Sequence, residues 1–225
     1  MKLIKVWDLP TRLFHWILVL VLLTSVYTGL DGGFEEMDYH KLSGYTVLTL
    51  ILFRLSWGFI SKGNAGFSKF IVGPSKIRAY LKGGMKEEST GHNPLGGLSV
   101  IAMLSIILLQ VISGLFSNDD IMIEGPLIHL ISDDLSSQFT SIHHLNAWLL
   151  AGIVTLHLCA ILYHKLVLKH ELVKAMFTGN KMFGGNKLSD IDEELGNSNQ
   201  VIQSLIALVL LALSGLLVYA IITYL

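Results

Sequence analysis

The chain has 225 residues, of which 52% are hydrophobic and only 15% are charged, and its mean hydropathy is +0.60. A water-soluble domain carries about 25% charged residues, so this composition excludes an ordinary soluble protein. The net charge is −1, and we expect contact with membrane lipid and no nucleic-acid partner.

Five runs are apolar enough to cross a bilayer, which takes roughly 20 residues of helix. The first run contains His15 and Trp16, and no small-residue cleavage site follows it, so we interpret it as a retained helix rather than a signal peptide. The sequence therefore predicts an all-α membrane protein, with no evident internal repeat. The five runs are approximately residues 13–30, 40–60, 95–116, 143–168 and 201–225.

The loops between these runs differ in the sign of their charge. Residues 61–88 include six basic side chains, whereas residues 117–142 have none and five acids. The positive-inside rule therefore places the N-terminus and the basic loops in the cytoplasm, and the C-terminus outside. In the first basic loop, Pro74 followed by SKIRAYLK predicts a short helix whose basic residues face lipid headgroups.

The single cysteine, Cys159, falls in the fourth run. One cysteine excludes a disulfide within the chain, a Cys-x-x-Cys-His haem attachment and a cysteine-ligated iron–sulfur cluster. A redox centre in this chain must therefore be bound without thiolate ligands.

Histidine is the ionisable residue that the apolar runs contain most often. Of the nine histidines, three fall in predicted loops, where we expect solvated or interfacial side chains: His92, His129 and His170. Ionisable residues inside a membrane are rare and are usually functional. The predicted helices carry His15, His40, His143, His144, His157 and His164.

Helix geometry groups these histidines by depth. His143 and His157 are 14 residues apart, which on a helix is about 40° of net rotation and a rise of about 21 Å, so they share a face. His40 and His143 both lie toward the outer ends of their helices. His15 lies toward the inner end and matches either His157 or His164, which depth alone does not separate. Two facing imidazoles can hold a metal between them, and haem iron is the natural occupant.

Two arginines and a glycine support a haem site. Arg54 follows His40 by 14 residues on the same face, and Arg12 is one turn from His15, so both could bind haem propionates. The alternative is that both arginines extend to the cytoplasmic headgroups. Gly44 lies one turn after His40 and would leave room for a haem plane, or else would allow tight packing between helices.

Several motifs resemble the bacterial cytochrome b561 family, which includes the b-type cytochrome subunits of nickel–iron hydrogenases. They are RLFHW (12–16), HKLSG (40–44), RLSWG (54–58), GHNPLGG (91–97) and the spacing of His143, Ala147 and His157. The resemblance covers about residues 5–180. It implies a four-helix transmembrane bundle in a bacterial inner membrane, with two non-covalent b haems. It also implies His15 with His157 as ligands of the inner haem, and His40 with His143 for the outer haem.

The run at residues 201–225 lies outside this resemblance, after an acidic spacer. We interpret residues 1–180 as a di-haem domain and residues 181–225 as a linker with a fifth transmembrane helix. This helix would anchor the chain by packing in the membrane, or it would dock a partner. The resemblance implies electron transfer between the quinone pool and a redox protein. That partner would be a periplasmic cytochrome c or a hydrogenase, and the protein would be an electron-transfer subunit rather than a self-contained enzyme.

Two other functions are compatible with the sequence. The protein could oxidise or reduce a small molecule such as superoxide at the outer haem, in exchange with quinone. It could also be a haem-free anchor or transporter with a histidine proton relay, although such transporters tend to have repeats and broken helices. No quinone motif can be identified; the candidates are His92 and Asn93 on the inner side and Lys41 or His144 on the outer side.

Overall fold

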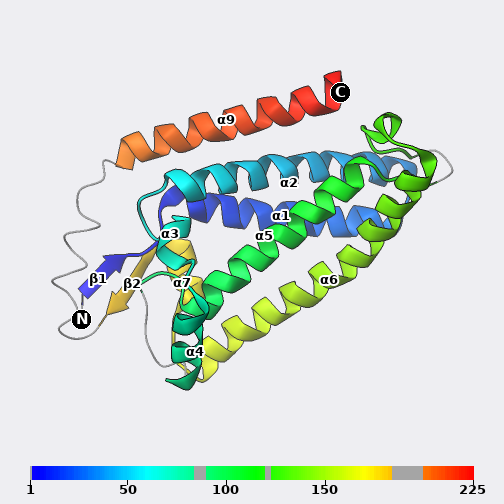
Figure 1. Cartoon of the computed structure of the whole chain (residues 1–225). Helices are drawn as coiled ribbons and strands as arrows, with labels where there is room; N and C mark the ends of the chain where they lie inside the picture. Colours follow the sequence, from blue (N-terminus) through cyan, green and yellow to red (C-terminus); the bar gives the residue numbers. More distant parts are fainter. Residues whose placement is uncertain (1, 84–89, 120–122, 184–199) are drawn as a thin grey trace. The chain divides into compact units, whose positions relative to one another are not determined.

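The computed structural model describes residues 2–83, 90–119, 123–183 and 200–225. Within these ranges, five helices are long and apolar enough to span a membrane, which confirms the prediction of a multi-pass helical membrane protein. They are α1 (Leu9–Asp31), α2 (Phe34–Ile60), α5 (Pro94–Leu115), α6 (Asp133–Leu166) and α9 (Gln200–Tyr224) (Figure 1). The arrangement of four helices plus one stays a prediction.

Helix α1 begins four residues earlier than predicted, at Leu9, and two other helices begin earlier still. Helix α6 begins at Asp133 rather than near residue 143, and α2 begins at Phe34 rather than at residue 40. In both cases the added turns are polar and amphipathic, so a search for apolar runs does not detect them. The acidic pair Asp133 and Asp134 therefore forms the first turn of α6, where negative charge is favourable, instead of lying in a loop.

The contacts divide the chain into two compact units. Unit 1 comprises residues 1–14, 54–101 and 156–210, and unit 2 comprises residues 15–53, 102–155 and 211–225. These units are groups of contacts, and the predicted domain boundary at residue 180 stays a prediction. The acidic spacer at residues 184–199 lies outside the described residues.

Unit 1 contains a small antiparallel sheet that joins distant parts of the chain. Strand β1 (Lys2–Lys5) pairs with β2 (Asn180–Phe183), so that Leu3 is opposite Met182 (Figure 1). The inward side of this region is a cluster of Ile4, Val6, Trp7 and Ala175, the last of these from α7 (Leu172–Thr178). The N-terminal residues are thereby fixed against the segment that follows α6.

The basic loop of unit 1 folds into two short helices, α3 (Phe67–Phe70) and α4 (Pro74–Lys82). Helix α4 has Pro74 in its first turn, as predicted from the sequence. Tyr80 is buried, whereas Lys76, Arg78 and Lys82 are exposed. This distribution is typical of a helix whose basic side faces water or lipid headgroups.

Unit 2 has its core where the end of α5 meets α2 and α9. Leu48, Leu115, Leu127 and Val218 are its buried centre. The loop after α5 folds back on the helix end, because the Leu127 N–H donates to the carbonyl oxygen of Leu115 at 2.9 Å. A 3-10 turn, η1 (Ile128–Leu130), follows before α6 begins.

Candidate functional site

Unit 2 brings together His40 of α2 and His143 of α6. Their ring centroids are 6.1 Å apart and their planes are nearly perpendicular, at 86°. A metal ion bonded to two opposed imidazole nitrogens, at about 2 Å each, leaves the ring centroids about 6 Å apart. The separation of the two rings therefore matches that of two axial ligands on one metal.

The orientation of each ring is set by a backbone carbonyl on a third helix. The Nδ1 atom of His40 lies 2.8 Å from the carbonyl oxygen of Ser25 on α1, and Nδ1 of His143 lies 2.9 Å from that of Gln110 on α5. A carbonyl oxygen can only accept, so each Nδ1 is the protonated nitrogen. This assignment leaves the Nε2 atom of both rings for a ligand, which is the usual arrangement of metal-binding histidines.

A glycine makes room for each ring. A Cβ atom added at Gly29 would lie 2.8 Å from the His40 ring, and one added at Gly114 would lie 3.0 Å from the His143 ring. Each glycine is four residues after the residue whose carbonyl accepts the hydrogen bond, Ser25 in one helix and Gln110 in the other. The same local device therefore positions both histidines.

Sequence reasoning missed these supporting residues, although a signal exists. The segments SVYTG (25–29) and QVISG (110–114) match position by position in residue type: a polar residue, Val, an apolar or aromatic residue, a hydroxyl residue and Gly. The hydroxyl residues, Thr28 and Ser113, are buried. Ser113 donates to the Gln110 carbonyl oxygen at 3.0 Å, whereas Thr28 is 3.3 Å from that of Ser25 and 2.8 Å from that of Thr24. A search for matched short motifs on different helices would have found this correspondence.

An amide pair, buried Asn146 and half-buried Gln110, lies beside His143. The Gln110 Nε2 atom is 3.1 Å from Nε2 of His143, and Asn146 Nδ2 donates to Gln110 Oε1 at 2.7 Å. A metal bound at Nε2 of His143 would displace the Gln110 amide from this nitrogen. Next to the other histidine, a Cβ atom on Gly44 would meet no described atom within 4 Å, so the space that the sequence predicts there is open.

Unit 1 contains Arg54, which is buried, with 3% of its surface exposed. Its Nη2 donates to the carbonyl oxygen of Ala65 at 3.0 Å, and its guanidinium lies 5.1 Å from the centre of the Phe67 ring. The side chain therefore does not extend to the headgroups. Its Nη1 atom is buried and has no hydrogen-bond partner among the described residues.

Arg12 is half-buried near the start of α1. Its Nη1 lies 3.3 Å from the carbonyl oxygen of Thr178, and its buried Nε has no hydrogen-bond partner in the described part of the chain.

Asp8 caps the start of α1, because its Oδ1 accepts from the Thr11 N–H at 2.7 Å. Its Oδ2 accepts from the Trp57 indole at 3.3 Å.

His92, for which the sequence predicts a solvated or interfacial side chain, lies in the loop before α5 and is half-buried rather than solvated. Its ring lies between those of Trp7 and Phe70, at centroid distances of 4.7 and 4.8 Å. Burial, followed by the charges of Arg54 and His157, lowers the pKa of His92 to about 4. His92 is therefore neutral at pH 7, and its Nδ1 is buried without a partner among the described residues.

The other predicted ligands fall in different units. His15 belongs to unit 2, where its ring packs edge-on against Trp16 at 5.0 Å, and His157 belongs to unit 1, where it is half-buried on α6. His164, the alternative to His157, has its Nδ1 only 3.2 Å from Nδ1 of His170.

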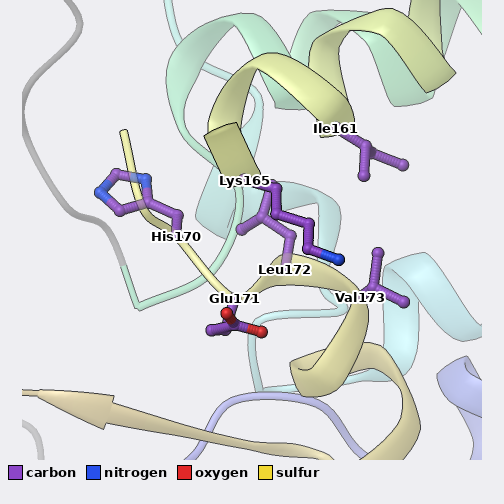
Figure 2. Close-up of a pocket in the computed structure, with 6 residues that line it drawn as sticks. All are labelled: Ile161, Lys165, His170, Glu171, Leu172 and Val173. Atoms are coloured by element: carbon purple, nitrogen blue, oxygen red, sulfur yellow. The ribbon is translucent and has the colours of Figure 1, made fainter. Parts of the chain in front are cut away.

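A small pocket adjoins His170 at the end of α6 (Figure 2). It has room for about one water molecule, which is far too little for a macrocycle. Figure 2 shows the charged groups of Lys165 and Glu171 at this pocket, and its other lining residues are Ile161, Leu172 and Val173. This pocket therefore lacks the space that a haem requires.

Of the quinone candidates named above, two have structural roles. The Asn93 Oδ1 accepts from the Gly96 N–H at 2.7 Å and so caps α5, and Lys41 pairs with Asp38 at 3.2 Å. His144 is exposed.

The donor set fits haem. Two histidines in unit 2 have ring centroids at a separation suited to two ligands of one iron, with an open space at Gly44. In unit 1, buried guanidinium nitrogens without partners among the described residues are the kind of donors that propionates need. The residues present therefore suit a bis-histidine haem with carboxylate side chains.

Comparison with known proteins gives three relatives along most of the chain. The probable Ni/Fe-hydrogenase 1 B-type cytochrome subunit of Escherichia coli K12 is 20% identical and covers 82% of this chain and 93% of its own. The probable Ni/Fe-hydrogenase B-type cytochrome subunits of Rhizobium leguminosarum bv. viciae and Azotobacter vinelandii are 21% and 24% identical. These two cover 79% and 78% of this chain and 88% and 87% of their own.

No solved structure matches the chain significantly. The model of the prokaryotic cytochrome b561 family matches residues 6–179, which include α1, α2, α5 and α6. The matched region contains every histidine that the sequence and the geometry single out. The chain therefore belongs to the prokaryotic cytochrome b561 family and is a membrane-spanning b-type cytochrome.

Proposed function

We propose that this cytochrome transfers electrons between the quinone pool and a redox partner protein through two haem b groups, each held by two histidines. The observation that carries the proposal is the pairing of His40 with His143 at a ring separation of 6.1 Å. Haem iron supplies a one-electron couple between its ferric and ferrous states.

The chain's own residues fix the ligands before iron binds. The carbonyl oxygens of Ser25 and Gln110 accept from the two Nδ1–H groups, so neither ring can present the wrong nitrogen. Ligands held in one orientation reorganise little when the charge on the metal changes, and their hydrogen bonds raise their basicity. Gln110 and Asn146 then place a polar amide pair within the membrane beside the outer ligand.

For the inner haem we propose His15 and His157 as ligands. This assignment rests on helix depth and on the family resemblance, and the Nδ1 contact of His164 with His170 favours His157 over His164. Arg54 and Arg12 would hold propionates of this haem, because both have buried nitrogens without partners among the described residues. Along α6 the two haems would be about 20 Å apart, given 14 residues of helical rise.

We propose a hydrogenase-type partner, because the relatives' names describe hydrogenase cytochrome subunits. A basic periplasmic cytochrome c is the second candidate, favoured by the acidic residues of the loops and of the start of α6, such as Asp119 and Asp133. Both candidate partners require the orientation that the basic loops predict, with the N-terminus in the cytoplasm of a bacterium and the C-terminus in the periplasm.

A haem count on the purified protein tests this function. We expect two b haems per chain by the pyridine haemochrome assay, and reduction of both by a short-chain quinol. His15→Ala and His157→Ala should remove the same haem, whereas His164→Ala should remove none. A protein without haem would refute the proposal, and rapid quinone reduction by superoxide without a protein partner would favour the small-molecule alternative.

A further inference from the structure

Three buried nitrogens of unit 1 lack a hydrogen-bond partner among the described residues: Nε of Arg12, Nη1 of Arg54 and Nδ1 of His92. The last two belong to side chains that pack against the same group of aromatic rings. Nearly all buried polar atoms in folded proteins are hydrogen-bonded, so such atoms indicate a partner that the polypeptide does not supply. A guanidinium can only donate, and a neutral imidazole donates from one of its nitrogens. A group that satisfies both atoms is therefore an acceptor.

The two side chains belong to one aromatic cluster. Arg54 lies over Phe67, the Phe67 and Phe70 centroids are 5.8 Å apart, and the Phe70 ring packs against His92. The far side of His92 is covered by Trp7. Because aromatic rings hold both side chains, neither needs to reorganise to meet a ligand.

The charges of the site favour an anion. No carboxylate of the described residues forms an ion pair with Arg54: the charge of Asp8 acts on it, but the two Asp8 oxygens accept from the Thr11 N–H and the Trp57 indole. Within the described residues, Arg54 donates to the neutral carbonyl of Ala65. His92 is neutral at pH 7 and so adds a donor without a second charge. One cation and one neutral donor match a single carboxylate, which can accept from both at once.

The position of the cluster indicates which carboxylate this is. Arg54, His92 and His157 belong to the same compact unit, and His157 is a proposed ligand of the inner haem. Haem carries two propionates, so a carboxylate would accompany iron bound at His157.

We propose that Arg54 and His92 together bind one propionate of the haem held by His157, with Arg54 Nη1 and His92 Nδ1 as the donors. This inference rests on the proposed function and adds His92 to it as a binding residue. The sequence places His92 in a loop motif, GHNPLGG, where nothing assigns it to a haem.

Redox titration of the holoprotein, followed by its absorption spectrum, tests this inference. The inner haem is first identified as the one that His157→Ala removes. His92→Phe keeps a ring between Trp7 and Phe70 but removes the donor, and His92→Gln restores an N–H. His170→Phe is the matched control, because it changes a half-buried histidine at the end of α6.

We expect His92→Phe to shift the reduction equilibrium of the inner haem about threefold to tenfold toward the ferric state, because a less neutralised carboxylate favours the higher iron charge. The outer haem and the His170→Phe control should not change, and His92→Gln should recover most of the shift. Arg54→Gln should shift the same haem, and the double variant should shift it less than additively, since both residues bind one group.

Three results would overturn the inference. The first is an unchanged inner-haem equilibrium in both His92 variants, and the second is additive effects of His92→Phe and Arg54→Gln. The third is an unchanged equilibrium with a raised KM for quinol, which would assign the His92 donor to quinone instead. In each of these cases wild-type protein still carries two haems, so the proposed function would stand.

Discussion

His40 and His143 face each other from α2 and α6, and each is held through Nδ1 by a carbonyl oxygen of a different helix. Four helices therefore contribute to the orientation of two imidazole rings. The relationship explains why polar and small residues, which are costly or weakly packing in a membrane, are present at these depths of α1 and α5.

Replacing either member of this pair should remove one haem and leave the other. We expect His40→Ala and His143→Ala each to lower the haem content from two to one per chain, because one axial ligand does not retain a b haem through purification. The pyridine haemochrome assay measures this content. His144→Ala, which changes the exposed neighbour, is the control and should retain two haems.

The two supporting glycines should be intolerant of a methyl group. A Cβ on Gly29 or Gly114 would lie 2.8 or 3.0 Å from the adjacent histidine ring, so the ring or the helix must move. Overpacking of this kind costs about 1–3 kcal/mol, and we expect retention of the outer haem to weaken by about tenfold.

Competition with apomyoglobin would measure that loss of retention. The matched control for the glycine variants is Gly215→Ala on α9, whose new methyl would lie 3.8 Å from Thr49, an ordinary contact. Equal retention in all three variants would mean that the glycines do not position the rings.

Asp8 should stabilise the start of α1. Its side chain caps the helix at the Thr11 N–H and also accepts from the Trp57 indole. Asp8→Ala should lower the free energy of unfolding by about 1–2 kcal/mol, as measured by thermal denaturation in detergent. Asp8→Asn keeps an acceptor oxygen at the cap and should lower the free energy of unfolding much less.

The buried neutral state of His92 should make unfolding pH-dependent in protein prepared without haem. The pKa of this group is about 4 when folded and 6.5 when unfolded, so between these values the unfolded chain binds more protons. Stability should therefore be complete above about pH 6.5 and should fall as the pH approaches 4, by up to about 3 kcal/mol. Thermal unfolding at pH 7 and pH 4.5 measures this difference, which His92→Phe should abolish.

Neutralising the outer acids should slow the encounter with a basic periplasmic partner. We expect the quadruple Asn variant of Asp119, Asp120, Asp133 and Asp134 to reduce the association rate and its salt dependence. Asp120 lies outside the described residues. Ser132, whose Oγ accepts from the Leu135 N–H at the start of α6, is unchanged in this variant. Stopped-flow oxidation by cytochrome c measures the rate, and an unchanged rate and salt dependence would exclude these acids as the docking surface.

The sequence alone predicts the elements that depend on composition and helical spacing. Five apolar runs correspond to five long helices, and depth matching on those helices pairs His40 with His143, which the structure brings together. The start of α6 was missed because its first turns are polar; Ser132 before the acids Asp133 and Asp134 was the available N-cap signal.

The contacts of the site could not be predicted, because they depend on which helices are neighbours. Nothing local to Gln110 or Ser25 indicates that a histidine on another helix will donate to its carbonyl oxygen. The burial of His92 was also missed, since a motif rich in Gly and Asn is typical of a solvated loop. Only the fold reveals that Trp7, at the far end of the sequence, covers that ring.

The pairing of β1 with β2 also affects the order in which the chain folds during synthesis. Lys2 is opposite Phe183, so β1 leaves the ribosome first but can pair only after four long helices and β2 have been synthesised. At about 5–20 residues per second this wait is about 10–35 s. The beginning of the chain is thus among the last segments to be fixed, and the sheet closes only when the region matched by the cytochrome family is complete.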